Sequence, residues 1–265
     1  MKITTLLLCS ILGTAMLAGC NGQTGNHGHE AKGAADSNGE VPMREIQVGG
    51  KVYNIADIDD SAHVYKQEVD KERCIIVISK KEYRLYVYEA GQDGKDTVLA
   101  AHFPVCYAKY PEAKTKSGDM RTPESTLAQP FHISQIQDAS TWHHDFGDGR
   151  GSIPAYGGWF LRLETPGFTG VGIHGSTNNE ASVPGRDSEG CIRLRDADLI
   201  VLHDLYVQKG QPVVIKGITE DKMPFEVKAC EALGSSYTSP SPGNKRIGEE
   251  AATLPQEDAV TDTKS

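Results

Sequence analysis

Apolar segments with the two-residue period of β-strands dominate the middle of the chain. Residues 74–78 form a continuous apolar run, and residues 83–88 are rich in tyrosine. Both patterns are typical of buried or half-buried strands. The pattern predicts a mainly β fold. Glycine- and proline-rich loops separate further short strands, which are expected at 98–105, 131–136, 159–163, 170–174 and 212–215.

One segment has helical spacing instead. Leucines and a tyrosine recur between residues 199 and 206 at three- and four-residue intervals. Asp196 or Asp198 is the expected N-cap, and Gly210 marks the end of the segment. A second, weaker amphipathic pattern at 57–69 suggests a short helix before the first strand. The prediction is therefore a sheet with one helix packed beside it.

The first residues read as a targeting segment rather than as part of the fold. Lys2 precedes an apolar stretch, and residues 17–20 read Leu-Ala-Gly-Cys, which resembles a bacterial lipobox. Cleavage of a signal peptide over 1–19 leaves Cys20 as the first residue, where two or more acyl chains form a stable anchor. The alternatives are an ordinary secretory peptide or a chance cysteine. We expect a lipoprotein of the bacterial cell envelope, held at the membrane through this lipid on its periplasmic or extracytoplasmic face.

Two flanking segments have too little apolar surface to order themselves. Residues 20–42 are rich in glycine, alanine and asparagine and predict a disordered tether. Residues 235–265 are rich in serine, threonine, proline and glutamate and predict a disordered tail. The chain of 265 residues therefore contains one domain with appendages.

Charge and composition exclude two classes of protein. With 27 Lys and Arg against 36 Asp and Glu, the formal net charge is −9. A phosphate backbone is repelled by such a surface, so no nucleic-acid partner is expected. No stretch reaches the roughly 18 unbroken apolar residues of a spanning helix, so an integral membrane protein is not expected either.

Four cysteines remain after the segment that ends at Cys20. Cys74 and Cys106 each lie in an apolar run. A disulfide between them is one possibility in an oxidising compartment, but buried free thiols are favoured, because sequence spacing alone fixes no disulfide geometry. The remaining two are Cys191 and Cys230.

A histidine and a cysteine carry the candidate chemistry. His174 ends a predicted strand and is followed by Gly175, and Cys191 comes seventeen residues after the histidine. A cysteine attacks a carbonyl group as a thiolate, and a nearby histidine is the usual base. Strand alternation places Cys191 and Arg193 on one face. Backbone N–H groups of the turn 188–190 suit a developing oxyanion.

The alternative interpretation is a buried structural cysteine near a histidine whose hydrogen bonds are made within the fold. The combination of His174, Cys191 and Arg193 with glycines in both motifs favours a catalytic site. Papain-like peptidases place the cysteine before the histidine. The opposite order in this chain favours another family.

These motifs resemble the L,D-transpeptidase catalytic domain (YkuD family), whose pattern is H-G-[ST] followed by S-H-G-C-[IV]-[RN]-[LM]. The resemblance covers residues 72–217, which leaves an N-terminal extension over 43–71 and a C-terminal extension with the tail over 218–265. It implies a β-sandwich of mixed sheets, with a helix after the catalytic cysteine. It also implies a cysteine acyl-enzyme, peptidoglycan stem peptides as substrate, and acylation of the cysteine by carbapenems.

The resemblance also implies a role for each matched residue. Cys191 corresponds to the nucleophile and His174 to the general base, oriented by the Gly175 carbonyl. Gly190 and Cys191 correspond to the donors of oxyanion N–H groups. Substrate binding is expected of Ser188, Glu189 and Arg193, with Arg193 holding a substrate carboxylate.

Glu189 departs from the family pattern, in which most members carry histidine. A carboxylate aimed at the thiol raises its pKa and opposes catalysis. Alternatively, Glu189 pairs with Arg193 and positions the guanidinium. We favour the pairing, because an intact set of His, Gly, Cys and Arg is odd in an inactive enzyme.

The expected function is transfer of an acylated tetrapeptide stem, after release of D-alanine, to an amine of another stem or of a wall-attached protein. Hydrolysis of the same acyl-enzyme and a non-catalytic wall-binding lipoprotein are the alternatives. No metal or other cofactor is implied. Residues 142–145 resemble a metal site in composition, but the glycines that follow favour turns. Residues 156–160 are expected to form strand entry and core, with a substrate-facing aromatic as the less favoured alternative.

Overall fold

The computed structural model describes residues 41–94 and 96–240, which all belong to one compact unit. The expectations for the signal peptide, for Cys20 and for the tether up to residue 40 lie outside these residues, as does the tail from 241 onward. The strands are β1 (Met43–Val48), β2 (Lys51–Ala56), β3 (His63–Val64), β4 (Cys74–Ser79), β5 (Arg84–Ala90), β6 (Thr97–Pro104), β7 (Cys106–Ala108), β8 (Phe131–Asp138), β9 (His143–Asp145), β10 (Ser152–Pro154), β11 (Trp159–Glu164), β12 (Gly172–His174), β13 (Gly185–Ser188), β14 (Ile192–Arg193) and β15 (Pro212–Lys216). The helices are α1 (Asp196–Tyr206) and α2 (Pro224–Ala232), with short 3-10 turns at Lys71–Arg73, Glu180–Ser182 and Gly234–Ser236.

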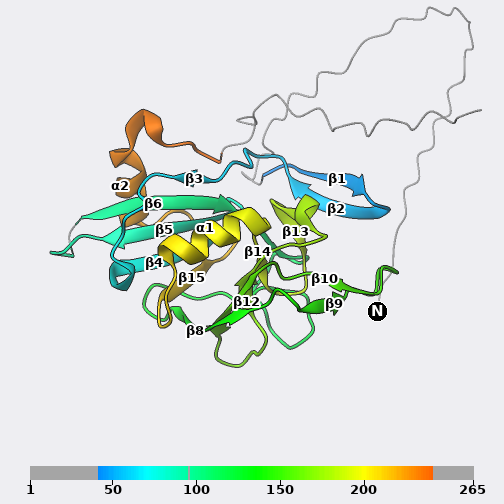
Figure 1. Ribbon diagram of the computed structural model, residues 1–265. Helices are drawn as coiled ribbons and strands as arrows, with labels where there is room; N and C mark the ends of the chain where they lie inside the picture. The colour runs from blue at the N-terminus through cyan, green and yellow to red at the C-terminus, as the bar shows by residue number, and fades with distance from the viewer. Residues whose placement is uncertain (1–40, 95, 241–265) are drawn as a thin grey trace, which may run out of the picture. The chain divides into compact units, whose positions relative to one another are not determined.

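Thirteen of the strands form one continuous mixed sheet (Figure 1). Their order is β1-β2-β13-β7-β14-β12-β11-β8-β15-β4-β5-β6-β3, and β9 and β10 form a separate hairpin. Three pairs are parallel: β12 with β14, β13 with β7, and β15 with β4. The expected mainly β fold with mixed pairing is therefore confirmed.

Two hydrophobic clusters lie on opposite faces of β4 and β5. Ile76 and Ile78 belong to the larger cluster, which also takes in Leu161 of β11, Ile192 of β14 and the buried face of α1. Both halves of the sheet thus enclose one core, as a β-sandwich does. Val77 belongs to the smaller cluster, which α2 covers. Burial on both faces explains why β4 is a continuous apolar run rather than an alternating one.

The longer predicted strands are confirmed to within about two residues at most ends. The short strands β3, β7, β9, β10 and β13 and the N-terminal hairpin of β1 and β2 were not predicted from the sequence. This hairpin joins the main sheet through β2, whose Ile55 pairs with Gly185 of β13. The extension before the family-like region is thus part of the same sheet.

The predicted helix near residue 200 is confirmed as α1, but its N-cap is neither Asp196 nor Asp198. Arg195 occupies the N-cap without a side-chain capping bond, and Asp196 is the first helical residue. The Asp196 carboxylate instead accepts hydrogen bonds from Ser176 N–H and from the Thr177 hydroxyl. The Asp196 carboxylate binds the loop after His174 and therefore does not cap its own helix.

The expected helix at 57–69 is wrong. This segment is extended and contains β3, and the N–H groups of Tyr65 and Lys66 both donate to the Ala100 carbonyl on β6. The buried Arg84 donates to the carbonyls of Asp59 and Ser61, which further holds the chain away from helical geometry. Main-chain pairing with the sheet edge overrides the weak amphipathic pattern.

The C-terminal part of the described chain contains features that the sequence analysis missed. Helix α2 begins with Pro224 and packs Ala229 and Cys230 against the smaller cluster. The first residues of the predicted tail also belong to the structure, since Gly234–Ser236 form a 3-10 turn and Tyr237 packs against that cluster. No helix in the described residues is long and apolar enough to cross a membrane.

The free-thiol alternative for Cys74 and Cys106 is confirmed. Both are buried and unpaired in the structure, on the separate strands β4 and β7.

Candidate active site

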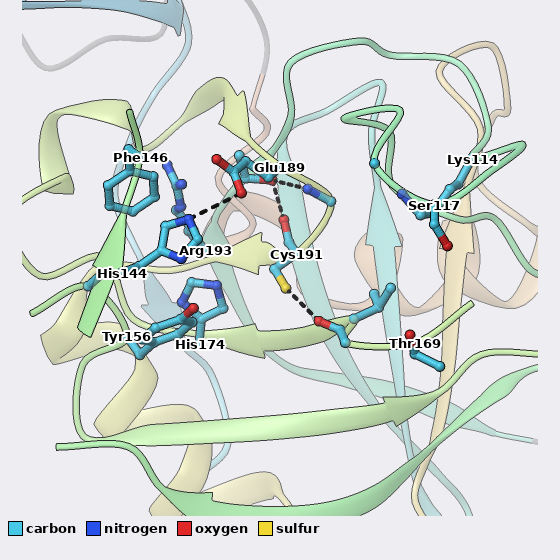
Figure 2. A pocket seen from close by; sticks show the side chains of 16 residues that line it. Lys114, Ser117, His144, Phe146, Tyr156, Thr169, His174, Glu189, Cys191 and Arg193 are labelled. Carbon is cyan, nitrogen blue, oxygen red and sulfur yellow. Dashed lines mark hydrogen bonds and ion pairs between the residues drawn. The ribbon is translucent and has the colours of Figure 1, made fainter. Parts of the chain in front are cut away.

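Parallel pairing of β12 with β14 brings the histidine and the cysteine together. His174 lies opposite Arg193, and Ile173 lies opposite Ile192. Ile192 is buried in the core, whereas Cys191, Arg193 and His174 line a pocket of about 310 Å³ (Figure 2). The alternation predicted for this strand is therefore confirmed. The pocket volume falls at the lower end of ordinary ligand sites.

The His174 ring is held in one orientation and one tautomer. Its Nδ1 lies 2.6 Å from the Gly175 carbonyl oxygen, as expected. Because a carbonyl only accepts, Nδ1 carries the proton and Nε2 keeps its lone pair. Burial and the nearby Arg193 lower the pKa of His174 to about 3. The imidazole is therefore neutral at pH 7.

Aromatic rings pack against this imidazole. Phe160 stacks on it at 5.5 Å between ring centroids, and Tyr156 contacts it at 4.8 Å. A Cβ on Gly172 would lie 2.5 Å from two ring atoms of Phe160, so only glycine permits this packing. These contacts fix the ring beside the pocket.

The Cys191 thiol is a neutral donor in this structure. It donates to the Gly170 carbonyl oxygen at 3.4 Å (Figure 2). Burial is the main cause that raises the thiol pKa, and the charge of Glu189 raises it further, while Gly172 N–H and Arg193 lower it. Among the described residues no hydrogen bond joins the thiol to His174. The thiol and the imidazole are thus both uncharged.

Ser188 holds the turn that leads into Cys191. Its hydroxyl donates to the Cys191 carbonyl at 2.6 Å and accepts the Gly190 N–H at 3.2 Å. Gly190 has φ +145°, and a Cβ there would lie 3.2 Å from the Arg121 carbonyl oxygen. The Gly190 N–H, expected at an oxyanion, is engaged by Ser188 here. A substrate contact of the buried Ser188 stays a prediction.

The expected pairing of Glu189 with Arg193 is wrong. Arg193 is 2% exposed, and its guanidinium donates to the Asp187 carbonyl at 3.2 Å and lies 5.1 Å from the centroid of the Phe146 ring. The Glu189 carboxylate instead contacts His144, with its Oε2 3.2 Å from Nε2 of that ring (Figure 2). Within the described residues the ion-pair partner of Arg193 is Asp187, and that of Glu189 is His144.

Several pocket residues were missed by the sequence analysis. His144, Phe146 and Lys114 line the pocket, and so does Tyr156, which was expected in strand entry and core. Lys51 of the N-terminal hairpin also reaches this region, where its Nζ lies 2.8 Å from Asp187. Their sequence separation from Cys191 leaves no local signal; only the aromatic and histidine content of residues 142–156 hinted at them.

The segment after Trp142 uses its polar groups for turns, as predicted. The Asp145 carboxylate accepts Gly147 N–H at 2.8 Å, and the Asp148 carboxylate accepts Arg150 N–H at 3.3 Å. Within residues 41–94 and 96–240 no group of three His, Cys, Asp or Glu side chains is placed to hold a metal ion.

The chain is similar to one protein family and to several solved structures. The family model of the L,D-transpeptidase catalytic domain, YkuD, matches residues 73–215, more than half of the chain. No curated protein matches. Among solved structures, Bd1075 of Bdellovibrio bacteriovorus is 17% identical, with 59% of this chain and 54% of that chain covered and a TM-score of 0.40. The helical cell shape determining protein Pgp2 of Campylobacter jejuni is 19% identical, with 64% and 56% covered and a TM-score of 0.39.

An L,D-transpeptidase from Mycobacterium smegmatis is 16% identical, with 67% of this chain and 68% of that chain covered and a TM-score of 0.39. The chain spans a little over half the length of the first two structures. The family assignment rests on the matched catalytic domain, which contains both the His174 and the Cys191 motifs. The chain belongs to the YkuD family of L,D-transpeptidase catalytic domains.

Proposed function

We propose that this chain is a peptidoglycan L,D-transpeptidase that uses Cys191 as its nucleophile. The observation that supports this most is the shared pocket of Cys191 and His174, in which the Gly175 carbonyl holds Nδ1 and leaves Nε2 as a base. A cysteine with a base oriented by a third group is the arrangement needed for acyl transfer.

In the acylation step, Sγ of Cys191 attacks the carbonyl carbon of the third residue of a tetrapeptide stem. The thiol proton passes to Nε2 of His174 as the sulfur–carbon bond forms, because neither group is charged beforehand. The Cys191 N–H stabilises the oxyanion, and the Gly190 N–H joins it only if its bond to Ser188 opens. The tetrahedral intermediate then expels D-alanine, whose amine takes the proton from His174.

In the second step an amine attacks the thioester. The amine transfers a proton to Nε2 of His174, a new amide bond forms, and the thiol of Cys191 is released. The acceptor is an amine of another stem or of a wall-attached protein. The Arg193 guanidinium is expected to hold a substrate carboxylate, although its burial restricts it to groups that enter the base of the pocket.

The proposed place of action is the bacterial cell envelope. A lipid on Cys20 would anchor the chain to a membrane, and the 23 positions from there to residue 42 would give the domain reach toward the wall. Incorporation of labelled palmitate into the wild-type chain, but not into Cys20→Ser, tests the anchor.

Analysis of muropeptides by mass spectrometry tests the reaction. Purified protein is incubated with tetrapeptide-rich sacculi, and Cys191→Ala serves as the control. We expect dimers linked through the third residue of both stems, together with free D-alanine. Tripeptides without new dimers or protein conjugates indicate hydrolysis instead, and unchanged muropeptides contradict an enzymatic role.

A further inference from the structure

A contact between His144 and Glu189, which both line the pocket, joins two segments far apart in the sequence. His144 lies on β9, and Glu189 immediately precedes the Gly190–Cys191 turn. Nε2 of His144 and Oε2 of Glu189 are 3.2 Å apart (Figure 2). The Glu189 side chain is 47% exposed and that of His144 is 32% exposed. This contact directly links the β9–β10 hairpin to the turn before Cys191.

Glu189 needs such a restraint because of its position. It lies two residues before the nucleophile and lines the same pocket as Cys191. Burial chiefly raises the pKa of the thiol, and the Glu189 charge adds to this, whereas Arg193 and Arg162 act in the opposite direction. Closer approach of the carboxylate strengthens its effect, because charge interactions grow as the distance falls.

His144, the partner of Glu189, is itself held in place. The His144 ring packs against Phe146 with ring centroids 4.5 Å apart, and also lies 6.2 Å from Tyr156. Arg150, in the same hairpin, donates to the Asn178 carbonyl and to the Asn179 side chain, each at 2.8 Å. His144 is therefore fixed by contacts that do not involve Glu189.

We infer that His144 is a positioning residue that holds the Glu189 carboxylate on the β9 side of the pocket, away from the Cys191 thiol. The inference rests on the proposed function for its biological meaning, but its test uses only thiol chemistry. Besides Glu189 and His144, the charged and titratable groups around the thiol are His174 of β12, Arg193 of β14, Arg162 of β11, Tyr156 of the loop before β11 and Lys114 beside Gly190. They are unchanged in the variants below.

The experiment measures alkylation of Cys191 by iodoacetamide as a function of pH. The full chain is compared as wild type, His144→Ala, Glu189→Gln and the double variant, and mass spectrometry of the Cys191 peptide gives a rate free of the other cysteines. We expect His144→Ala to slow alkylation at pH 7.5 by about two- to fivefold, the range expected of a partly exposed ion pair. Its pH profile moves to higher pH.

Glu189→Gln is expected to be as fast as wild type or faster. In that background His144→Ala has no further effect, because there is no carboxylate left to release. His144→Gln, which keeps a hydrogen-bond donor, restores most of the wild-type rate. His143→Ala is the matched control on β9, since His143 is exposed and its ring contacts only the Thr141 carbonyl among the bonds found.

An equal loss of rate from His144→Ala in the wild-type and Glu189→Gln backgrounds overturns the inference, because His144 then acts without Glu189. Unchanged alkylation in His144→Ala overturns it as well. Failure of the proposed function gives a different result: muropeptides stay unchanged with wild-type protein, while the alkylation rates still follow the pattern above.

Discussion

The resting state of the pocket is an uncharged thiol beside an uncharged imidazole. Burial raises the pKa of Cys191 above its usual range and, with Arg193, lowers that of His174 to about 3. Desolvation disfavours the charged form of each group, which explains why the two shifts have opposite directions. Cys191 and His174 therefore do not form a thiolate–imidazolium pair before substrate binds.

The pH dependence of thiol reactivity follows from these directions. A raised thiol pKa means that the thiolate fraction is small at pH 7 and increases as the pH rises through that raised value. We therefore expect the alkylation rate of wild-type Cys191 to be still rising at pH 9, without a plateau near neutrality. Stopped alkylation assays between pH 5 and 10 check this, and a plateau reached by pH 7 would show a preformed thiolate.

Gly172 is the residue on which the packing of His174 depends. A methyl group at this position meets the Phe160 ring, which stacks on His174. We expect Gly172→Ala to lower the free energy of unfolding by about 1–3 kcal/mol, the usual cost of overpacking, and to abolish most acylation. Urea denaturation and carbapenem acylation measure the two effects. Gly158→Ala, where no atom lies within 4 Å of the added Cβ, is the control and keeps both.

At the scale of elements, the first turn of α1 supports the loop that follows His174. The Asp196 carboxylate accepts the Ser176 N–H at 2.7 Å and also the Thr177 hydroxyl, which in turn accepts Gly157 N–H at 3.1 Å. The helix thereby holds the Gly175 carbonyl against the imidazole. Such a carboxylate serves a neighbouring loop rather than its own helix.

Removal of the Asp196 carboxylate should weaken the restraint on the His174 ring. Hydrogen bonds to a charged group contribute about 1.5–3 kcal/mol, so Asp196→Ala is expected to lower the free energy of unfolding by about that amount and to reduce the rate of Cys191 acylation. Chemical denaturation and acylation kinetics give the two values. Asp204→Ala, on the same helix and paired only with the neighbouring His203 through its side chain, should leave both unchanged. Equal behaviour of the two variants contradicts the supporting role.

The long strands could be predicted from the sequence because their signal is local. Residues 74–78 are apolar throughout and α1 has a clear helical period, and both were found where expected. Short strands such as β7 and β13 exist because of their neighbours in the sheet and have too few residues to show a period of their own. The extended segment around β3 is fixed by main-chain bonds to Ala100, which the sequence pattern does not encode.

The residues of the candidate site also fall into those with a local sequence signal and those without one. Cys191, His174 and the Gly175 carbonyl could be predicted from two short motifs. The partner of Glu189 could not, since His144 lies 45 residues away and reaches Glu189 only through the β9–β10 hairpin. The preference for an Arg193 pair failed for a physical reason as well, because burial turns the guanidinium toward Asp187.

At the scale of the whole described unit, the N-terminal hairpin takes part in the site although it precedes the matched family region. Nζ of Lys51 lies 2.8 Å from the Asp187 carboxylate, which in turn lies 3.6 Å from the Arg193 guanidinium. The same ammonium group lies 5.3 Å from the centroid of the Phe146 ring. The hairpin thus contacts Phe146, which lines the pocket, and Asp187, the ion-pair partner of Arg193.

Replacement of Lys51 tests whether these contacts matter. We expect Lys51→Met to lower stability by only about 0.5–1 kcal/mol, since partly exposed ion pairs contribute little, and to slow acylation of Cys191 several-fold as Asp187 and Arg193 lose alignment. Acylation kinetics and thermal unfolding separate the two. Lys81→Met removes an exposed pair with Asp221 outside the pocket and should match wild type. Wild-type acylation in Lys51→Met would limit the hairpin to a structural role.

The central claim is that Cys191 accepts an acyl group from substrate, and intact-mass spectrometry with a carbapenem tests it most directly. Three proteins are incubated with the carbapenem, and their intact masses are measured: the wild type, Cys191→Ala and Cys230→Ala. The last variant removes a buried cysteine as a control. The account predicts one covalent adduct on the wild type and on Cys230→Ala, and none on Cys191→Ala. The absence of an adduct on the wild type, or an adduct that persists in Cys191→Ala, would contradict it.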